Sequence, residues 1–253
     1  MAKPARQAIA SSAGGSALAP ADGVGLMRDN LSRQAHRHIK DRLIAGKLPP
    51  AARLGLRDVA IDLGISVTPA REALLQLVAE RALVVGRGNA IHVAALSAAH
   101  CRELWDIRLC LEQLAAEAAL PRITTALIRR MAVSNELMLA AKQARDVDGG
   151  MDHNRDFHFA LYEAAAMPTL FWTIETLWAQ AGAYVRYFLE HHVRTRTAAS
   201  VQGPHVHATI VEALRRGDAA GLRRGMARDL IEIRDGILGL LPGDAKEAAR
   251  GSG

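Results

Sequence analysis

Apolar residues recur at helical spacing along most of this chain. The pattern is clearest in two sets: Leu31, Ala35, Ile39 and Leu43, and Leu104, Ile107, Leu111 and Leu114. Steps of three and four residues place such side chains on one face of a helix. Only 4% of the 253 residues are aromatic, and the runs of Val, Ile and Thr that favour strands are scarce. The sequence therefore predicts a mainly α-helical protein with enough apolar residues to bury a core.

The segment from residue 23 to residue 95 predicts a series of short elements. In order, these are a helix ending near Gly46, a turn over 48–54, a short helix over 56–63 stopped by Gly64, a longer helix, and a β-hairpin of 83–85 and 90–93. Thr68 and Pro69 suit the N-cap and the first position of the longer helix. This order is typical of a winged helix-turn-helix, whose helix starting at Thr68 would enter the major groove of DNA.

A different pattern begins after residue 95. Ser97 can cap a long helix that stops before Pro121. Further helical stretches are expected over 122–145, 150–166, 169–191, 204–216 and 218–240, with breaks at Gly149-Gly150, Met167-Pro168, Gly203-Pro204 and Gly217. This pattern predicts an all-α antiparallel bundle of about six helices. The predicted domains are a flexible tail (1–22), a winged helix-turn-helix (23–95), the bundle (96–241) and a second flexible tail (242–253).

Positive charge is concentrated in the predicted winged segment. The chain carries a formal net charge of +6. Residues 23–95 hold eleven Lys and Arg against six Asp and Glu, whereas residues 96–253 hold nineteen of each kind. A basic excess confined to one domain indicates a polyanionic partner such as double-stranded DNA.

Other classes of protein fit the sequence poorly. Two cysteines, Cys101 and Cys110, are too few for a disulfide framework or a thiolate zinc site. No apolar run is long enough to cross a membrane, and the N-terminus lacks the apolar core of a signal peptide. We therefore expect a cytoplasmic protein with no membrane partner. Because the sequence contains no nucleophile elbow, phosphate-cradling glycine loop or HExxH pattern, we do not expect an enzyme.

Five stretches of this sequence resemble a known family. IAGKLPPAARL (44–54) and LRDVAIDLGISVTPAREALLQL (56–77) resemble the winged-helix domain of GntR-family bacterial transcription regulators. ELWDIRLCLEQLAAEAA (103–119), NRDFHFALYEAAAMPTLF (154–171) and HATIVEALRRGDAAGLRRGMARDL (207–230) are similar to the FCD ligand-binding domain of the FadR branch. The resemblance covers about residues 25 to 240. This sequence departs from the family at Val67, often Arg or Pro, at Pro50-Ala51, usually Pro-Gly, and at Asp229, usually His.

The resemblance implies DNA contacts at Arg53, Arg57, Thr68 and Arg71. Arg71 lies near the start of the expected recognition helix, where a guanidinium can reach a guanine edge or a phosphate. The hairpin tip (Arg87, Gly88 and Asn89) fits a wing that touches the minor groove. Each arginine taken alone could equally be a solvated surface charge.

The spacing of four polar residues permits a divalent-metal site in the bundle. Asn154 and His158 stand four residues apart on one helix face. Asp229 follows His207 by 22 residues, and the Gly217 turn between them would return the chain to the same level. The resemblance assigns the ligands Asn154, His158, His207 and Asp229, a set suited to zinc, nickel or manganese. Alternatively, these histidines are packed without a metal, or His205 replaces His207.

The resemblance also implies an effector carboxylate at Arg108, with Arg186 as a second candidate. Alternatively, Arg108 forms a structural ion pair with Glu112. Together these features predict a homodimeric, DNA-binding transcription regulator of the repressor type. It would bind a palindromic operator and sense a small organic acid through a divalent metal. The alternatives are a regulator whose bundle is purely structural, and a metal-dependent enzyme tethered to DNA.

Overall fold

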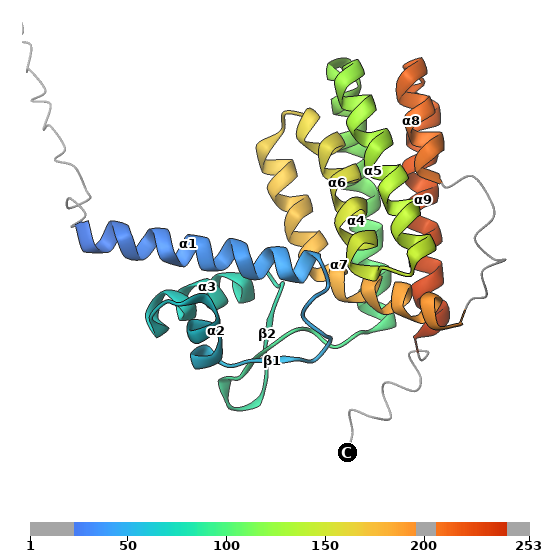
Figure 1. Cartoon of the computed structure of the whole chain (residues 1–253). Coiled ribbons are helices and arrows are strands. Elements are labelled where there is room, and N and C mark those ends of the chain that lie inside the picture. Colours follow the sequence, from blue (N-terminus) through green and yellow to red (C-terminus); the bar gives the residue numbers. More distant parts are fainter. Residues whose placement is uncertain (1–22, 196–205, 242–253) are drawn as a thin grey trace, which may run out of the picture.

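The computed structural model describes residues 23–195 and 206–241. The chain forms a small N-terminal winged unit and a helical bundle (Figure 1). The winged unit comprises α1 (Gly23–Ile44), β1 (Arg53–Leu54), α2 (Leu56–Leu63), α3 (Val67–Ala79), β2 (Val84–Val85) and β3 (Ile91–His92). The bundle comprises α4 (Ala98–Ala119), α5 (Thr125–Ala144), α6 (Val147–Ala164), α7 (Pro168–Thr195), α8 (Val206–Arg216) and α9 (Ala219–Leu240). The predicted flexible tails, Gly203-Pro204 and His205 lie outside the described residues.

The winged unit confirms the predicted order of elements. Ile39 and Leu43 of α1 and Leu74 and Leu77 of α3 are at most 3% exposed, so the predicted helix faces form its core. Leu31, by contrast, is 39% exposed. Gly64 ends α2 in the left-handed conformation, with φ of 63°, and so allows the tight turn into α3.

Two local predictions for the winged unit are wrong. The helix α3 begins at Val67 after Ser66, so Thr68 is not its N-cap, and no side chain caps this end of the helix. Pro69 is still tolerated because the N–H groups of the first turn need no helical partner. Part of the predicted turn at 48–54 forms β1, which pairs antiparallel with β3, while β3 pairs with β2. A two-residue strand is too short to show an alternating pattern in sequence.

The bundle confirms the predicted six helices among the described residues. Ser97 caps α4 by accepting a hydrogen bond from the His100 amide, at 3.4 Å. The predicted break at Gly149-Gly150 is wrong, because both glycines lie inside α6. That helix starts earlier because Asp146 caps it by accepting from the Gly149 amide, at 3.0 Å. In the described part of the chain, none of the helices is both long and apolar enough to cross a bilayer.

The end of α1 packs tightly against α7. A Cβ added at Gly182 of α7 would lie 1.9 Å from the Leu43 carbonyl oxygen, so only glycine permits this approach. Beside this contact, the ammonium group of Lys40 lies 2.9 Å from Thr176 Oγ1 and 3.1 Å from Glu80 Oε2. Lys40 is 6% exposed, so these interactions replace its hydration. They join α1 and α3 of the winged unit to α7 of the bundle.

Replacing Gly182 with alanine should loosen this junction. The added methyl group would force α1 and α7 apart, and overpacking of this kind typically costs about 1–3 kcal/mol. We expect the Gly182→Ala variant to have a lower free energy of unfolding in urea denaturation. Gly239→Ala is the matched control, because nothing lies within 4 Å of the added Cβ. Equal stability of both variants would show that α1 does not pack closely on α7.

Candidate nucleic-acid interface and candidate metal centre

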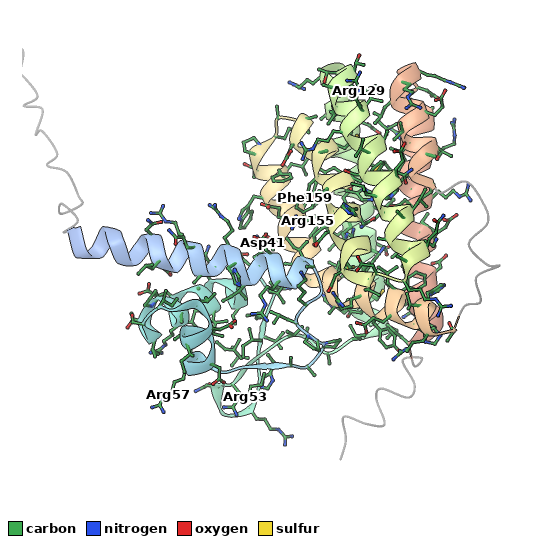
Figure 2. The ribbon with its side chains drawn as sticks, in the orientation of Figure 1. Asp41, Arg53, Arg57, Arg129, Arg155 and Phe159 are labelled. Carbon is green, nitrogen blue, oxygen red and sulfur yellow. The ribbon has the colours of Figure 1, made fainter. Side chains whose placement is uncertain are left out.

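The predicted DNA-contacting side chains are exposed on the winged unit. Arg57 lies on α2, Thr68 and Arg71 lie on α3, and all three are exposed. Figure 2 shows Arg53 and Arg57 pointing away from the bundle, whereas Arg129 lies at its far end. The structure therefore brings the helix and strand residues of the predicted interface onto a surface that a polyanion can reach.

These arginines differ from those of the bundle in their partners. Within residues 23–195 and 206–241, no carboxylate pairs with Arg53, Arg57, Arg71 or Arg87. Many bundle arginines are neutralised, with N–O distances of 2.5 Å for Arg223–Glu117, 2.5 Å for Arg228–Glu232 and 2.7 Å for Arg216–Glu212. The free positive charge of the winged unit is therefore available for phosphate groups.

The tip of the wing is shaped by two left-handed residues. Gly88 and Asn89 have φ of 66° and 60°, which are the values expected for a tight hairpin turn. Arg87 precedes them and is exposed. The predicted wing residues thus share one exposed turn that connects β2 and β3.

Three of the predicted metal ligands converge inside the bundle. His158 of α6, His207 of α8 and Asp229 of α9 are 2%, 0% and 8% exposed. The two histidine Nε2 atoms lie 3.2 Å apart. The carboxylate of Asp229 lies 3.2 Å from Nε2 of His158 and 3.4 Å from Nε2 of His207. We call these residues the His158 cluster. Asn154 lies one turn before His158 and lines the cavity beside the cluster.

Electrostatics favour metal-binding protonation states in the cluster. Burial alone would raise the pKa of Asp229, but the adjacent His207 and His158 outweigh burial and hold that pKa far below its usual range. Burial also lowers the pKa of His207, against the opposing effect of Asp229. Asp229 is therefore an anion and His207 a neutral imidazole near neutral pH, as metal coordination requires.

A buried network orients His158. Tyr162 donates to Oε2 of Glu112 at 2.5 Å, and the same hydroxyl oxygen lies 3.1 Å from Nδ1 of His158. Burial, reinforced by Glu112, raises the pKa of Tyr162, so the phenol keeps its proton. Since the O–H of Tyr162 donates its hydrogen bond to Glu112, the hydroxyl oxygen accepts from Nδ1–H of His158. The lone pair of Nε2 therefore faces His207 and Asp229.

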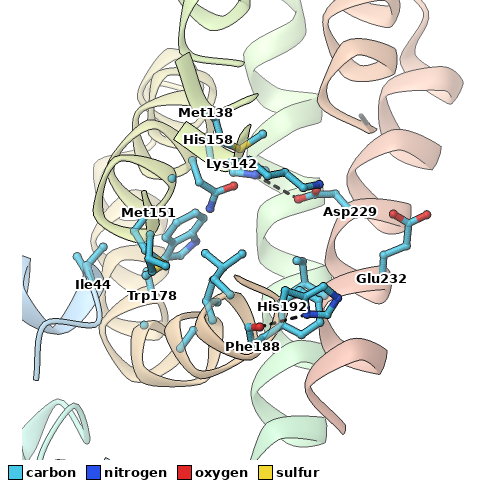
Figure 3. A pocket seen from close by; sticks show the side chains of 18 of the residues that line it. Ile44, Met138, Lys142, Met151, His158, Trp178, Phe188, His192, Asp229 and Glu232 are labelled. Atoms are coloured by element: carbon cyan, nitrogen blue, oxygen red, sulfur yellow. Dashed lines mark hydrogen bonds and ion pairs between the residues drawn. The ribbon is translucent and has the colours of Figure 1, made fainter. Parts of the chain in front are cut away.

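A cavity of about 710 Å³ lies beside the His158 cluster (Figure 3). Arg108 lines it and is 4% exposed. Its guanidinium is bonded to Glu112 at 2.7 Å and lies 4.8 Å from the ring centre of Trp105 and 4.9 Å from that of Trp178. Trp105 also lines the cavity, and its buried indole N–H has no hydrogen-bond partner among the described residues.

Arg186 lies elsewhere. It is not part of the cavity wall, but donates to the carbonyl oxygen of Ala45 at 3.4 Å and pairs with Asp148 and with Glu190, the latter at 3.2 Å. It therefore joins the end of α1 to α6 and α7.

Three residues that support the site escaped the sequence analysis in these roles. Glu112 appeared only as a partner of Arg108, while Tyr162 and Trp178 were not singled out. Tyr162 follows His158 by four residues, and Glu112 follows Arg108 by four, so helical spacing was an available signal. Trp178 donates to Oε1 of Glu112 at 3.0 Å. No helical spacing indicates this contact, because the two residues lie on different helices.

Both parts of the chain match known protein families. Residues 31–93 match the family described as bacterial regulatory proteins, gntR family, and residues 103–231 match the FCD domain. The HTH-type transcriptional regulator McbR of Escherichia coli (strain K12) is 31% identical over 206 residues, covering 81% of this chain and 92% of that protein. The HTH-type transcriptional repressor RspR of the same strain is 24% identical, covering 82% of this chain and 89% of that protein.

Solved structures show the same architecture. The structure of E. coli McbR/YncC has a TM-score of 0.75 at 30% identity, covering 83% of this chain and 97% of that chain. A GntR transcriptional regulator from Rhodococcus sp. RHA1 has a TM-score of 0.67 at 20% identity, covering 85% of this chain and 100% of that chain. The second likeness concerns the fold alone.

Removing Glu112 should destabilise the bundle strongly. The Glu112→Ala substitution would leave Arg108 as a buried charge without its carboxylate, which typically costs about 3–5 kcal/mol. Urea denaturation would measure the loss. Glu163→Ala is the matched control, because its pair with Arg130 is exposed and should contribute less than about 1 kcal/mol. A loss no larger than that of the control would contradict the importance of this network.

Proposed function

This chain belongs to the GntR family of bacterial regulatory proteins and carries an FCD domain, and from that premise we propose that it is a dimeric repressor controlled by a metal-bound carboxylate. Regulation of transcription through DNA binding follows from the family. The observation that best supports a specific DNA interface is the group of exposed arginines without carboxylate partners on the winged unit. The observation that supports sensing is the His158 cluster beside a large cavity.

The recognition helix of the proposed complex is α3. Its exposed Thr68 and Arg71 would contact DNA at the start of the helix, where the backbone N–H groups also favour a phosphate. Arg57 and Arg53 would contact the flanking backbone, and Arg87, Gly88 and Asn89 would approach the minor groove. In this arrangement Arg71 is the residue best suited to a base edge, because a guanidinium can bond a guanine bidentately.

A single winged unit is too small for tight and specific binding. One module buries roughly 600–1,000 Å² of protein surface on DNA. Two units related by a two-fold axis would double this contact and would recognise a palindromic operator. We therefore propose a homodimer. The relative RspR is named a transcriptional repressor, and we propose repression for this chain as well.

The His158 cluster fits a divalent metal. Ligand atoms around one tetrahedral zinc-like ion, each about 2.0–2.1 Å from it, lie about 3.3–3.4 Å apart. The distances of 3.2 Å, 3.2 Å and 3.4 Å within the cluster agree with this spacing. The lone pair of His158 Nε2 and the Asp229 carboxylate both face the centre of the cluster, where a cation would be stabilised. His158, His207 and Asp229 would hold the metal, with Asn154 as a further candidate ligand.

A metal held there would supply positive charge to bind the carboxylate of a small acid. Arg108 would add a positive charge on the same wall. The mixed set of two nitrogens and one carboxylate oxygen is compatible with zinc, nickel or manganese. An effector that weakens DNA binding by a given factor must bind more weakly to the DNA-bound protein by the same factor.

The DNA interface is tested by the Arg71→Ala substitution. If Arg71 contacts a guanine edge, its loss should weaken binding to the operator by about 1–3 kcal/mol and relax the preference at one base position. A gel-shift titration on operator DNA would measure both effects. The control is Arg129→Ala, at the far end of the bundle, which should leave affinity unchanged. Unaltered affinity and sequence preference in Arg71→Ala would refute this assignment.

The metal site is tested by the His158→Ala substitution. Loss of one of the three converging ligands should lower metal affinity by at least about tenfold, since even changes around a ligand cost tenfold to a hundredfold. Metal analysis of the purified protein by mass spectrometry, after equal exposure to zinc or manganese, would measure the content. His153→Ala changes a histidine of α6 outside the cluster and should keep its metal. Equal metal content in both variants, or none in the parent protein, would reject the site.

A further inference from the structure

The cavity beside the His158 cluster is larger than a small acid requires. Its volume of about 710 Å³ lies within the range of roughly 300–1,000 Å³ that holds drug-sized ligands. An acid of about six non-hydrogen atoms, such as lactate, fills only about a quarter of this space if each atom occupies no more than the roughly 30 Å³ of a water molecule. A ligand that matches the cavity must therefore be larger than acetate or lactate.

The wall of the cavity carries charged groups around the His158 cluster and is otherwise mainly apolar. His158, Asp229, Asn154, Arg108 and Lys142 are polar residues at the metal end. Apolar side chains on α5, α6, α7 and α9 form most of the wall: Met138, Met151, Val185, Phe188, Leu189 and Ile233. The polar residues Gln143, Arg145, Asp146, His192 and Glu232 also line it. Figure 3 shows Phe188 well apart from His158 and Asp229. The cavity therefore offers a charged end for an acid head and a mainly apolar wall for a hydrocarbon body.

The apolar wall favours ligands that cover it. A short acid would leave this surface in contact with water, whereas each methylene group buried against it should tighten binding by roughly three- to fourfold. Met138 and Met151 add flexible side chains that adapt to the shape of an apolar ligand.

We propose that the cavity binds an amphipathic monocarboxylic acid with a hydrocarbon body of roughly eight to twelve carbons. Its carboxylate lies at the metal-loaded His158 cluster, and its body lies along α7 between the methionines and Ile233. This inference rests on the proposed function and narrows its effector from any small acid to an amphiphile.

The test is a chain-length series measured by isothermal titration calorimetry on the full-length, zinc-loaded protein. The ligands are acetate, butyrate, hexanoate, octanoate and decanoate, each kept below its micelle-forming concentration. We expect the affinity to rise by at least about a hundredfold from butyrate to decanoate. A flat series, or tightest binding by acetate, would overturn the inference and leave metal-dependent carboxylate sensing intact. Failure of every acid to bind would overturn both.

The position of the head is tested with His158→Ala. We expect the affinity for decanoate to fall at least about tenfold when the His158 side chain, which would coordinate the metal, is removed. Unchanged decanoate binding by this variant would show that the acid is held without the cluster, and so would overturn the proposed orientation.

The position of the body is tested with Leu189→Trp, which narrows the apolar part of the cavity. Decanoate affinity should fall at least about tenfold, while acetate affinity stays within about twofold, because only the longer acid reaches this wall. Tyr187→Trp is the matched control on the same helix, at a residue outside the wall. Equal losses for both acids would overturn the assignment. Val185→Trp tests the same wall if Leu189→Trp does not fold, and the chain-length series needs no variant.

Discussion

The buried carboxylate of Glu112 is the constraint on which the interior of the bundle depends. It is 0% exposed and accepts hydrogen bonds from Arg108 of α4, Tyr162 of α6 and Trp178 of α7. A buried carboxylate is tolerated only when such partners replace its hydration. The Tyr162 hydroxyl donates its hydrogen bond to Glu112, so its oxygen accepts from Nδ1–H of His158. This contact orients Nε2 of His158 toward His207 and Asp229. One buried charge therefore holds three helices together and presets the metal ligands.

The helix α7 connects this interior to the winged unit. Its Trp178 bonds Glu112, its Val185 and Leu189 line the cavity, and its Gly182 lies against the last turn of α1. Ile44 at the end of α1 also lines the cavity. A ligand in the cavity would thus contact both domains. Since closely packed helices shift as units rather than deform, a change in the position of α7 would move α1 and the recognition helix with it.

The predictions from sequence succeeded where a signal is local. Helical spacing located α1 and α4, and the predicted order of the winged unit is present, because amphipathic helices carry much of their burial pattern in their own residues. The apolar face predicted for α4 is nevertheless only partly buried, since Ile107 and Leu114 are 43% and 47% exposed. Two local predictions failed. Two consecutive glycines suggested a break before residue 150, but the Asp146 cap lets α6 begin ahead of them. The strand β1 is only two residues long, and its place in the sheet comes from β3, which lies far along the chain.

The sequence by itself determined the helical class, the basic charge of the winged unit and the pairs four residues apart, such as Asn154 with His158. The charge depends only on which residues are present, and the helical features depend only on backbone geometry within a turn or two. Tertiary structure alone decided that His207 and Asp229 meet His158, that Glu112 accepts the hydrogen bond of the Tyr162 hydroxyl, and that Arg108 lines the cavity whereas Arg186 does not. The physical reason is that these distances join separate helices, whose positions depend on side-chain packing throughout the bundle.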